Sequence, residues 1–317
     1  MKPFYFLKGR TALKYGLKYL GLKKNDKLLV PAFICDVVIE ELNQLDIKPV
    51  YYLINKNFDA NWSDIKKKYS KNVKGILMVN FFGKPQKINK FKKFSKKKNI
   101  YLIEDNCHGF SGLKNVKLSS DMVITSPYKI MNEINHGGIL FIQDNKKKLD
   151  LKNIDRHIIT IYTKIINLIK KINFLRNVKQ FIFKRPDYES FTINIKKDIQ
   201  NDYLLDYDSI QKISKFSYFK EKKLRITRFK AWKKQLSKFN IKPYFNYTKR
   251  DNYILWYLVA KINDRKIRKK FYDWGWEKNI HIVSWPSFSR KLKNNNKIHK
   301  FSRSLVLFPL NKDLNDE

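Results

Sequence analysis

The chain has 317 residues, with 68 Lys and Arg against 28 Asp and Glu, and therefore a formal net charge of +40. Its 43% hydrophobic and 15% aromatic content excludes a disordered tail, and the length suits about two domains with a sizeable core. The charge favours nucleic-acid binding, yet only 11 of the cations are arginines, and lysine is spread through every segment with abundant Asn and Ile. A codon bias of the genome is therefore the preferred explanation of the charge.

Cysteine usage and the N-terminus bear on the compartment. Cys35 and Cys107 are too few for a disulfide scaffold and fit a reducing environment. The N-terminus lacks a long apolar core followed by a small-residue cleavage site, so we expect a cytoplasmic location. The segment 158–175 contains three lysines, which favours an amphipathic helix over a membrane span. No histidine or cysteine spacing predicts a metal site.

Short apolar runs alternate with helical patterns through the first half of the chain. We expect helices at 11–20, 36–45, 62–69 and 86–97, and strands at 28–30, 50–54, 76–81, 100–104, 122–125 and 139–142. This order predicts an α/β fold with a mainly parallel sheet covered by helices on both faces. In such sheets ligands bind beyond the carboxyl ends of the strands.

The second half has a different composition, because nine of the ten glycines precede residue 139. We expect helix from about 151 to 180, an irregular polar stretch to about 205, and helix again from 207 to 238. Short strands are expected near 253–259, 281–284 and 305–308. The resulting division is a large domain at 1–205 and a smaller α+β domain at 206–317.

Polar residues capable of chemistry follow the predicted strands at one edge of the sheet. Asp105 and His108 come after one strand, and Ser126 and Lys129 come after the next. The first helix is preceded by Gly9-Arg10 and begins with Thr11. Each residue has an ordinary explanation as a turn residue, a helix cap or a surface lysine. Their shared position at one edge favours a common site.

Such a set of groups suits one kind of cofactor. A helix N-terminus with a threonine hydroxyl can hold a phosphate, a lysine can bond to an aldehyde, and a buried carboxylate can keep a pyridine nitrogen protonated. Those are the protein groups that pyridoxal 5'-phosphate (PLP) requires.

Several motifs resemble the DegT/DnrJ/StrS-type aminotransferases, and they occur in the family's order. They are GRTAL (9–13), LLVPAF (28–33), VNFFGKPQ (79–86), LIEDNCHG (102–109), SPYK with a following GG (126–138), VSWPSF (283–288) and LFPLNKDL (307–314). The resemblance is weakest from about 145 to 205. It implies a fold-type-I PLP-dependent transferase with a mainly parallel large domain and a smaller C-terminal domain.

The resemblance also implies an activity and partners. The enzyme would transfer an amino group, from glutamate, to a keto-sugar nucleotide for surface polysaccharide or glycoconjugate biosynthesis. Its small-molecule substrates are then that sugar nucleotide and the amino donor, and the family implies a homodimer without nucleic acid or a membrane span. Two alternatives stay open: a catalytically decayed or truncated family relative without turnover, and a basic nucleic-acid-binding protein.

Individual roles carry over by motif position. Lys129 matches the lysine that links to the cofactor and moves the substrate proton. Asp105 matches the carboxylate at the pyridine nitrogen, and His108 matches the Gln or His beside the cofactor's 3-oxygen. Relatives that dehydrate sugars have histidine at the position of Lys129, so this lysine favours the aminotransferase.

The phosphate would be held by Ser126, Thr11 and the backbone at Ala12. Where many members place an aromatic residue over the cofactor ring, this chain has Cys35, with Phe33 two positions before it. The Asn-x-Arg loop that reaches the phosphate from a second subunit has no clear match between 150 and 205. The family's final helix is also absent after LFPLNKDL.

Overall fold

The computed structural model describes residues 2–116, 118–144, 148–158, 202–278, 280–285 and 296–311. Most of the strands belong to one large sheet. They are β1 (Phe4–Phe6), β2 (Lys27–Pro31), β3 (Lys48–Tyr52), β4 (Val73–Val79), β5 (Tyr101–Asn106), β6 (Met122–Thr125), β7 (Gly138–Ile142), β8 (Asp155–Arg156) and β9 (Tyr203–Leu204).

The strand order of this sheet is β3-β2-β4-β5-β6-β7-β1-β9-β8. The strands β3, β2, β4, β5 and β6 run parallel to one another. The strand β7 is antiparallel to both β6 and β1. The predicted mainly parallel sheet is therefore confirmed. Parallel pairing brings the carboxyl ends of β4, β5 and β6 to one edge, where the sequence motifs lie.

Helices cover both faces of the large sheet. The helices α1 (Gly9–Tyr19) and α2 (Asp36–Gln44) pack on one face, and α3 (Trp62–Lys68) and α4 (Ile88–Lys98) pack on the other. Burial explains the arrangement of α1, whose buried residues include Leu13 and Leu17, four positions apart on one helical face. The four predicted helices of this half are confirmed to within about two residues, the usual uncertainty of helix ends.

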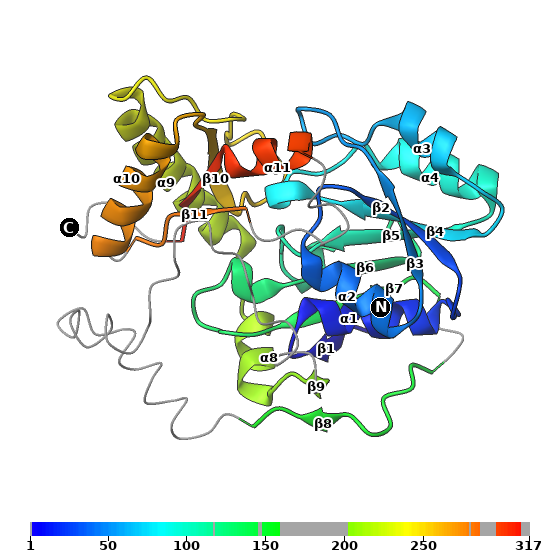
Figure 1. The fold of residues 1–317 in the computed structure, drawn as a ribbon. Helices are drawn as coiled ribbons and strands as arrows, with labels where there is room; N and C mark the ends of the chain where they lie inside the picture. Colours follow the sequence, from blue (N-terminus) through cyan, green and yellow to red (C-terminus); the bar gives the residue numbers. More distant parts are fainter. Residues whose placement is uncertain are drawn as a thin grey trace.

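The second half adds α8 (Tyr207–Ser214), α9 (Tyr218–Ser237), α10 (Arg265–Glu277) and α11 (Asn296–Arg303). Its strands β10 (Tyr257–Lys261), β11 (Val283–Ser284) and β12 (Leu305–Pro309) form an antiparallel sheet in the order β10-β12-β11. The α9 helix packs on β12, where the Trp232 indole N–H donates to the Pro309 carbonyl at 2.8 Å. Figure 1 shows α9, α10 and β10 beside the large sheet.

The structure corrects the sequence expectations in the second half. The helix expected from 151 is wrong at its start, because 155–156 forms β8, and the His157 amide donates to the Leu204 carbonyl. Pairing with β9 decides this segment, and a periodic pattern cannot reveal such a pairing. The remainder of that helix, and the amphipathic helix expected at 158–175, fall in 159–201, outside the described residues.

The helix predicted at 207–238 is observed as α8 and α9, separated by a break at 215–217. The helix α10 and the strand β1 were not expected. The domain boundary at 205/206 stays a prediction. Among the helices in the described ranges, none combines the length and apolarity required to span a bilayer.

One buried carboxylate between α1 and α2 predicts a pH-dependent stability. Glu41 is 2% exposed, Arg10 Nε lies 3.5 Å from its Oε1, and its Oε2 has no hydrogen-bond partner among the described residues. Burial raises the pKa of Glu41 from 4.5 to about 7, although Lys14 and Arg10 oppose the shift. Folded protein therefore keeps a proton that unfolded protein releases above pH 4.5.

We accordingly expect the free energy of unfolding to fall by about 3 kcal/mol from this group as the pH rises from 4.5 to about 7. Urea unfolding at pH 4.5, 6 and 8 measures the slope. Glu41→Gln keeps the shape of the side chain but cannot titrate. The free energy of unfolding of this variant should therefore lack the fall of about 3 kcal/mol that Glu41 contributes over this pH range. Identical slopes for the two proteins would contradict the assignment.

Candidate active site

Asp105 lies at the base of the site, near the carboxyl end of β5. It is 8% exposed, and it pairs with Val79 of β4 and Ile124 of β6. Ile103, two residues earlier on the same face of the strand, belongs to the apolar cluster that contains α1. Asp105 therefore faces the layer occupied by α1, at the edge where parallel α/β sheets bind their ligands.

The loop after β5 is tied to the end of β6. Asp105 Oδ1 accepts a hydrogen bond from the Cys107 amide at 2.9 Å. Burial raises the pKa of the Cys107 thiol well above its usual value, Asp105 adds to the shift, and Lys129 and a hydrogen bond with Ser126 oppose it. Asp105, Ser126 and Lys129, which were predicted as site residues from two separate motifs, therefore lie in one cluster around Cys107.

The start of α1 forms a cradle against Ser126. The helix begins at Gly9 after Lys8, which makes no side-chain cap, and its first turn contains no acidic residue. A Cβ placed on Gly9 would lie 2.3 Å from Ser126 Oγ and 3.0 Å from Cys107 Sγ. Only glycine therefore lets the serine hydroxyl approach the helix N-terminus, where amide N–H groups favour anions.

Two further residues were expected in this cradle. Thr11 is buried as the third residue of α1. The Ala12 amide donates to the Lys8 carbonyl at 3.2 Å, so it is engaged within the helix. The amides of the first turn, which precede Ala12, are better placed to meet an anion.

The glycine pair before β7 has a packing role at the same place. A Cβ on Gly138 would lie 2.2 Å from the Lys8 carbonyl oxygen and 2.5 Å from the Gly9 nitrogen. Both are backbone atoms, which cannot rotate away. Gly138 thus lets β7 pack closely against the first turn of α1, next to the cradle formed by Gly9 and Ser126.

Lys129 lies in a tight turn directly after β6. The turn is the 3₁₀ helix η3 (Pro127–Lys129), in which the Lys129 amide donates to the Ser126 carbonyl at 3.1 Å. Its Nζ lies 4.8 Å from the ring centroid of Trp256, a cation–π distance. Burial lowers the pKa of Lys129, but Tyr128, Cys107 and Asp105 raise it by more, so the net shift is upward.

His108 is held as a neutral donor. Its Nδ1 accepts a hydrogen bond from the Phe82 amide at 3.2 Å. Burial, helped by the nearby charge of Lys129, lowers the pKa of His108 well below 6.5. A neutral imidazole that accepts at Nδ1 has its hydrogen on Nε2, so His108 can donate one hydrogen bond from that atom.

The second half of the chain contributes two tryptophans that were not predicted as site residues. The Trp256 ring stacks on His108 at 4.2 Å between centroids, and the Trp256 amide donates to the Phe82 carbonyl at 2.8 Å. Trp285 is buried and meets His108 edge-on at 5.8 Å. No local pattern marks Trp256, since only the tertiary fold brings it to Lys129.

Cys35 and Phe33 occupy different surroundings. Phe33 is 1% exposed and packs in the core, 4.4 Å from Trp285 between ring centroids. Burial raises the pKa of Cys35, while Lys129 lowers it and Asp105 raises it, so the thiol lies within their electrostatic reach. Phe33 thus packs on the tryptophan that meets His108, whereas Cys35 lies close enough to Lys129 and Asp105 to interact with their charges.

Comparison with known proteins supports the resemblance seen in the motifs. The model of the DegT/DnrJ/EryC1/StrS aminotransferase family matches residues 7–161. GDP-perosamine synthase of Escherichia coli O157:H7 is 25% identical over 103 residues, which cover 32% of this chain and 28% of that protein. GDP-4-keto-6-deoxy-D-mannose 3-dehydratase of E. coli O55:H7 is 29% identical over 97 residues, 30% of this chain and 25% of that protein. The alignments thus span under a third of these relatives.

Solved structures match nearly the whole chain. NtdA of Bacillus subtilis with bound cofactor PMP has a TM-score of 0.65 at 15% identity, over 99% of this chain and 70% of that one. An aminotransferase of Psychrobacter cryohalolentis has a TM-score of 0.64 at 14% identity, over 99% and 84%. The predicted fold-type-I fold is confirmed. Residues 7–161 of the chain, just under half of its length, are similar to the DegT/DnrJ/EryC1/StrS aminotransferase family.

Proposed function

We propose that this protein is a PLP-dependent aminotransferase that transfers an amino group to a keto-sugar nucleotide. The observation that carries the proposal is the cluster of Lys129, Asp105 and Ser126 at the N-terminus of α1. One end of the cluster suits a phosphate, and the other presents an amine and a carboxylate. Such a set of groups fits PLP.

The residues fit the cofactor group by group. Ser126 Oγ and the first-turn amides of α1 would hold the phosphate, with Thr11 beside them. Asp105 would hold the pyridine nitrogen protonated, and His108 would donate its Nε2 hydrogen to the 3-oxygen. When bound, PLP supplies an electron sink that stabilises negative charge on the substrate carbon.

Lys129 would then move the proton at that carbon. Its amine lies 4.8 Å from the centroid of the Trp256 ring, which limits where the side chain can lie. The net upward shift of the Lys129 pKa keeps the free amine protonated at neutral pH, so it must lose a proton before it can act as base or nucleophile.

The relatives suggest the first substrate to test. One relative's name gives GDP-4-keto-6-deoxy-D-mannose as the compound on which that protein acts, and another relative is a GDP-perosamine synthase. We therefore propose a GDP-linked 4-keto-6-deoxy sugar as acceptor and glutamate as donor. Lysine at position 129 favours transamination over dehydration.

The test is reduction of PLP-loaded protein with borohydride, followed by peptide mass analysis. We expect a phosphopyridoxyl adduct on Lys129, and amino-sugar nucleotide with 2-oxoglutarate when both substrates are supplied. Loss of a sugar hydroxyl without glutamate consumption would favour a dehydratase. An adduct without turnover on any keto-sugar nucleotide would favour a relative that has lost activity, and no adduct on Lys129 would refute the mechanism.

The cradle at Gly9 makes a separate prediction. Gly9→Ala places a Cβ 2.3 Å from Ser126 Oγ, so the hydroxyl must rotate away. We expect about a tenfold loss of PLP affinity, which corresponds to one hydrogen bond. Spectroscopic titration with PLP measures this loss. Because both changes remove the same contact, Gly9→Ala with Ser126→Ala should cost little more than either alone. Additive losses would contradict the shared contact.

Three expectations stay predictions: the homodimer, the cytoplasmic location and the lack of nucleic-acid binding. For the last, the alternative predicts a DNA affinity that falls steeply with salt. Binding of duplex DNA at 50 and 200 mM salt would measure it.

A further inference from the structure

Arg225 of α9 is a fully buried cation next to the site. Its side chain is 0% exposed, and its Nε lies 2.6 Å from Glu221 Oε1, one helical turn earlier. A buried charge is costly unless it is paired and hydrogen-bonded. Burial lowers the pKa of Arg225 and Glu221 raises it, with a net downward shift, yet a guanidinium stays charged at neutral pH.

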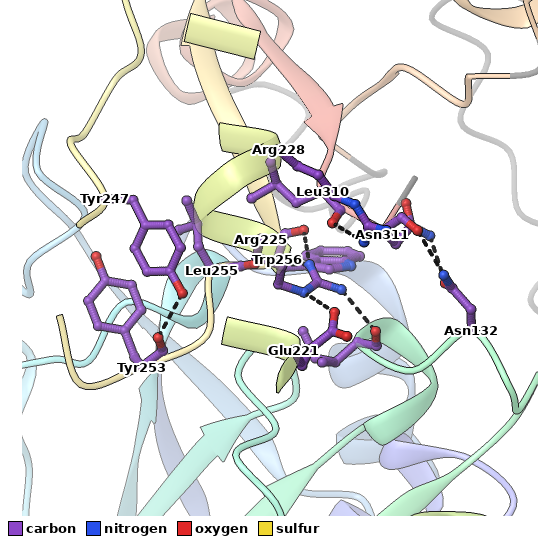
Figure 2. A network of polar contacts seen from close by, with 11 residues as sticks. Asn132, Glu221, Arg225, Arg228, Tyr247, Tyr253, Leu255, Trp256, Leu310 and Asn311 are labelled. Carbon is purple, nitrogen blue, oxygen red and sulfur yellow. Dashed lines mark hydrogen bonds and ion pairs between the residues drawn. The ribbon is translucent and has the colours of Figure 1, made fainter. Parts of the chain in front are cut away.

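The remaining nitrogens of Arg225 bond to backbone at two places in the site. One terminal nitrogen donates to the carbonyls of Leu255 at 3.0 Å and Trp256 at 2.8 Å, and the other donates to the Ile130 carbonyl at 2.9 Å. Figure 2 shows the guanidinium of Arg225 beside Glu221 and the backbone of Leu255 and Trp256. Ile130 directly follows Lys129, so one side chain joins the lysine turn to the tryptophan that covers it.

Arginine is suited to this position for a geometric reason. Its planar fork presents five hydrogens in fixed directions and so serves Glu221 and three carbonyls at once. The shorter lysine ammonium has three hydrogens on one atom and cannot reach all four acceptors. Substitution would leave buried carbonyls without donors, and each unsatisfied group is costly.

We propose that Arg225 is a positioning residue of the active site, which fixes the Lys129 amine against the Trp256 ring by bonding the backbone on both sides. The 4.8 Å distance between Lys129 Nζ and the Trp256 ring then depends on Arg225, and so does the stacking of His108 on that ring. Arg225 acts on both through its bonds to the backbone of Ile130 and Trp256. The role rests on the proposed function only in taking Lys129 as the reacting amine.

The experiment compares Arg225→Lys with Arg268→Lys, and it uses protein without cofactor. Arg268 is a matched control: it is also buried and also donates to two carbonyls, of Ile262 at 2.9 Å and Asn263 at 2.7 Å, within the second half. Labelling with acetic anhydride across pH 7 to 11, read by peptide mass, gives the pH profile and rate for Lys129. Amide hydrogen exchange reports on peptides that contain residues 126–131 and 254–257.

In Arg225→Lys we expect the Lys129 labelling rate to change by about threefold or more and both peptides to exchange about tenfold faster. Both measurements should stay as in the wild type in Arg268→Lys. If Arg225→Lys does not fold, Glu221→Gln serves instead, because it removes the paired charge and leaves the bonds of Arg225 to the carbonyls. It should change the labelling rate of Lys129 in the same direction as Arg225→Lys, by a smaller factor. An unchanged Lys129 profile in the folded variant, or equal changes in Arg268→Lys, would overturn the proposal.

This test separates the two proposals. If wild-type protein forms no PLP adduct on Lys129 but Arg225→Lys alters the labelling of that amine, the proposed function fails and the positioning role stands. If the adduct forms and Arg225→Lys leaves the labelling profile unchanged, the positioning role fails and the function stands.

Discussion

Replacement of Lys129 by alanine is expected to lower the transamination rate by about 10⁴-fold, the upper end of what loss of a positioned base costs. The change removes both the amine that bonds to the cofactor and the base that moves the substrate proton. The fold should survive, since Lys129 ends a short turn after β6 and its Nζ lies over the face of one ring. Coupled detection of 2-oxoglutarate from glutamate measures the rate, and circular dichroism monitors the fold.

A matched control separates this effect from loss of a cation–π contact. Lys98 Nζ lies 4.6 Å over the Tyr69 ring, at the end of α4. Lys98→Ala should therefore keep the wild-type rate. Addition of a small primary amine should restore part of the activity of Lys129→Ala if the side chain acts as a base. Residual activity of the alanine variant within tenfold of the wild type would exclude Lys129 from the reaction.

Replacement of Asp105 by asparagine is expected to lower the turnover rate by about 100-fold, equivalent to about 3 kcal/mol, the upper range for a hydrogen bond to a charged group. Asparagine keeps an oxygen that can accept from the Cys107 amide, so the loop after β5 should keep its shape. What is lost is the negative charge that would hold the pyridine nitrogen protonated, and the ring becomes a poorer electron sink.

The matched change is Asp105→Ala, which removes the charge and the acceptor together. We expect it to be less stable than Asp105→Asn, because the Cys107 amide loses its partner, while the two variants lose activity to a similar extent. Thermal unfolding and steady-state kinetics give the two quantities. Full activity of a folded Asp105→Asn protein would show that the carboxylate does not serve the cofactor.

The first half of the fold could be predicted because its signals are local. Strands at 122–125 and helices at 36–45 have apolar patterns that match a buried strand or one helical face, and the parallel sheet follows from their alternation. Fewer elements of the second half could be predicted from local patterns. The strand at 155–156 exists only through pairing with 203–204, which no local pattern encodes.

The sequence by itself determined which chemical groups are present and at which edge they gather. Asp105 lies near the end of one strand and His108 follows it, Ser126 and Lys129 follow the next strand, and parallel strands end together. Only the tertiary structure decided how those groups are held. Trp256 and Arg225 lie 127 and 96 residues beyond Lys129. Trp256 meets the lysine, and Arg225 meets Ile130 next to it, because the second half packs against the sheet edge. Their contacts depend on backbone carbonyls and ring faces, which every sequence contains and none specifies locally.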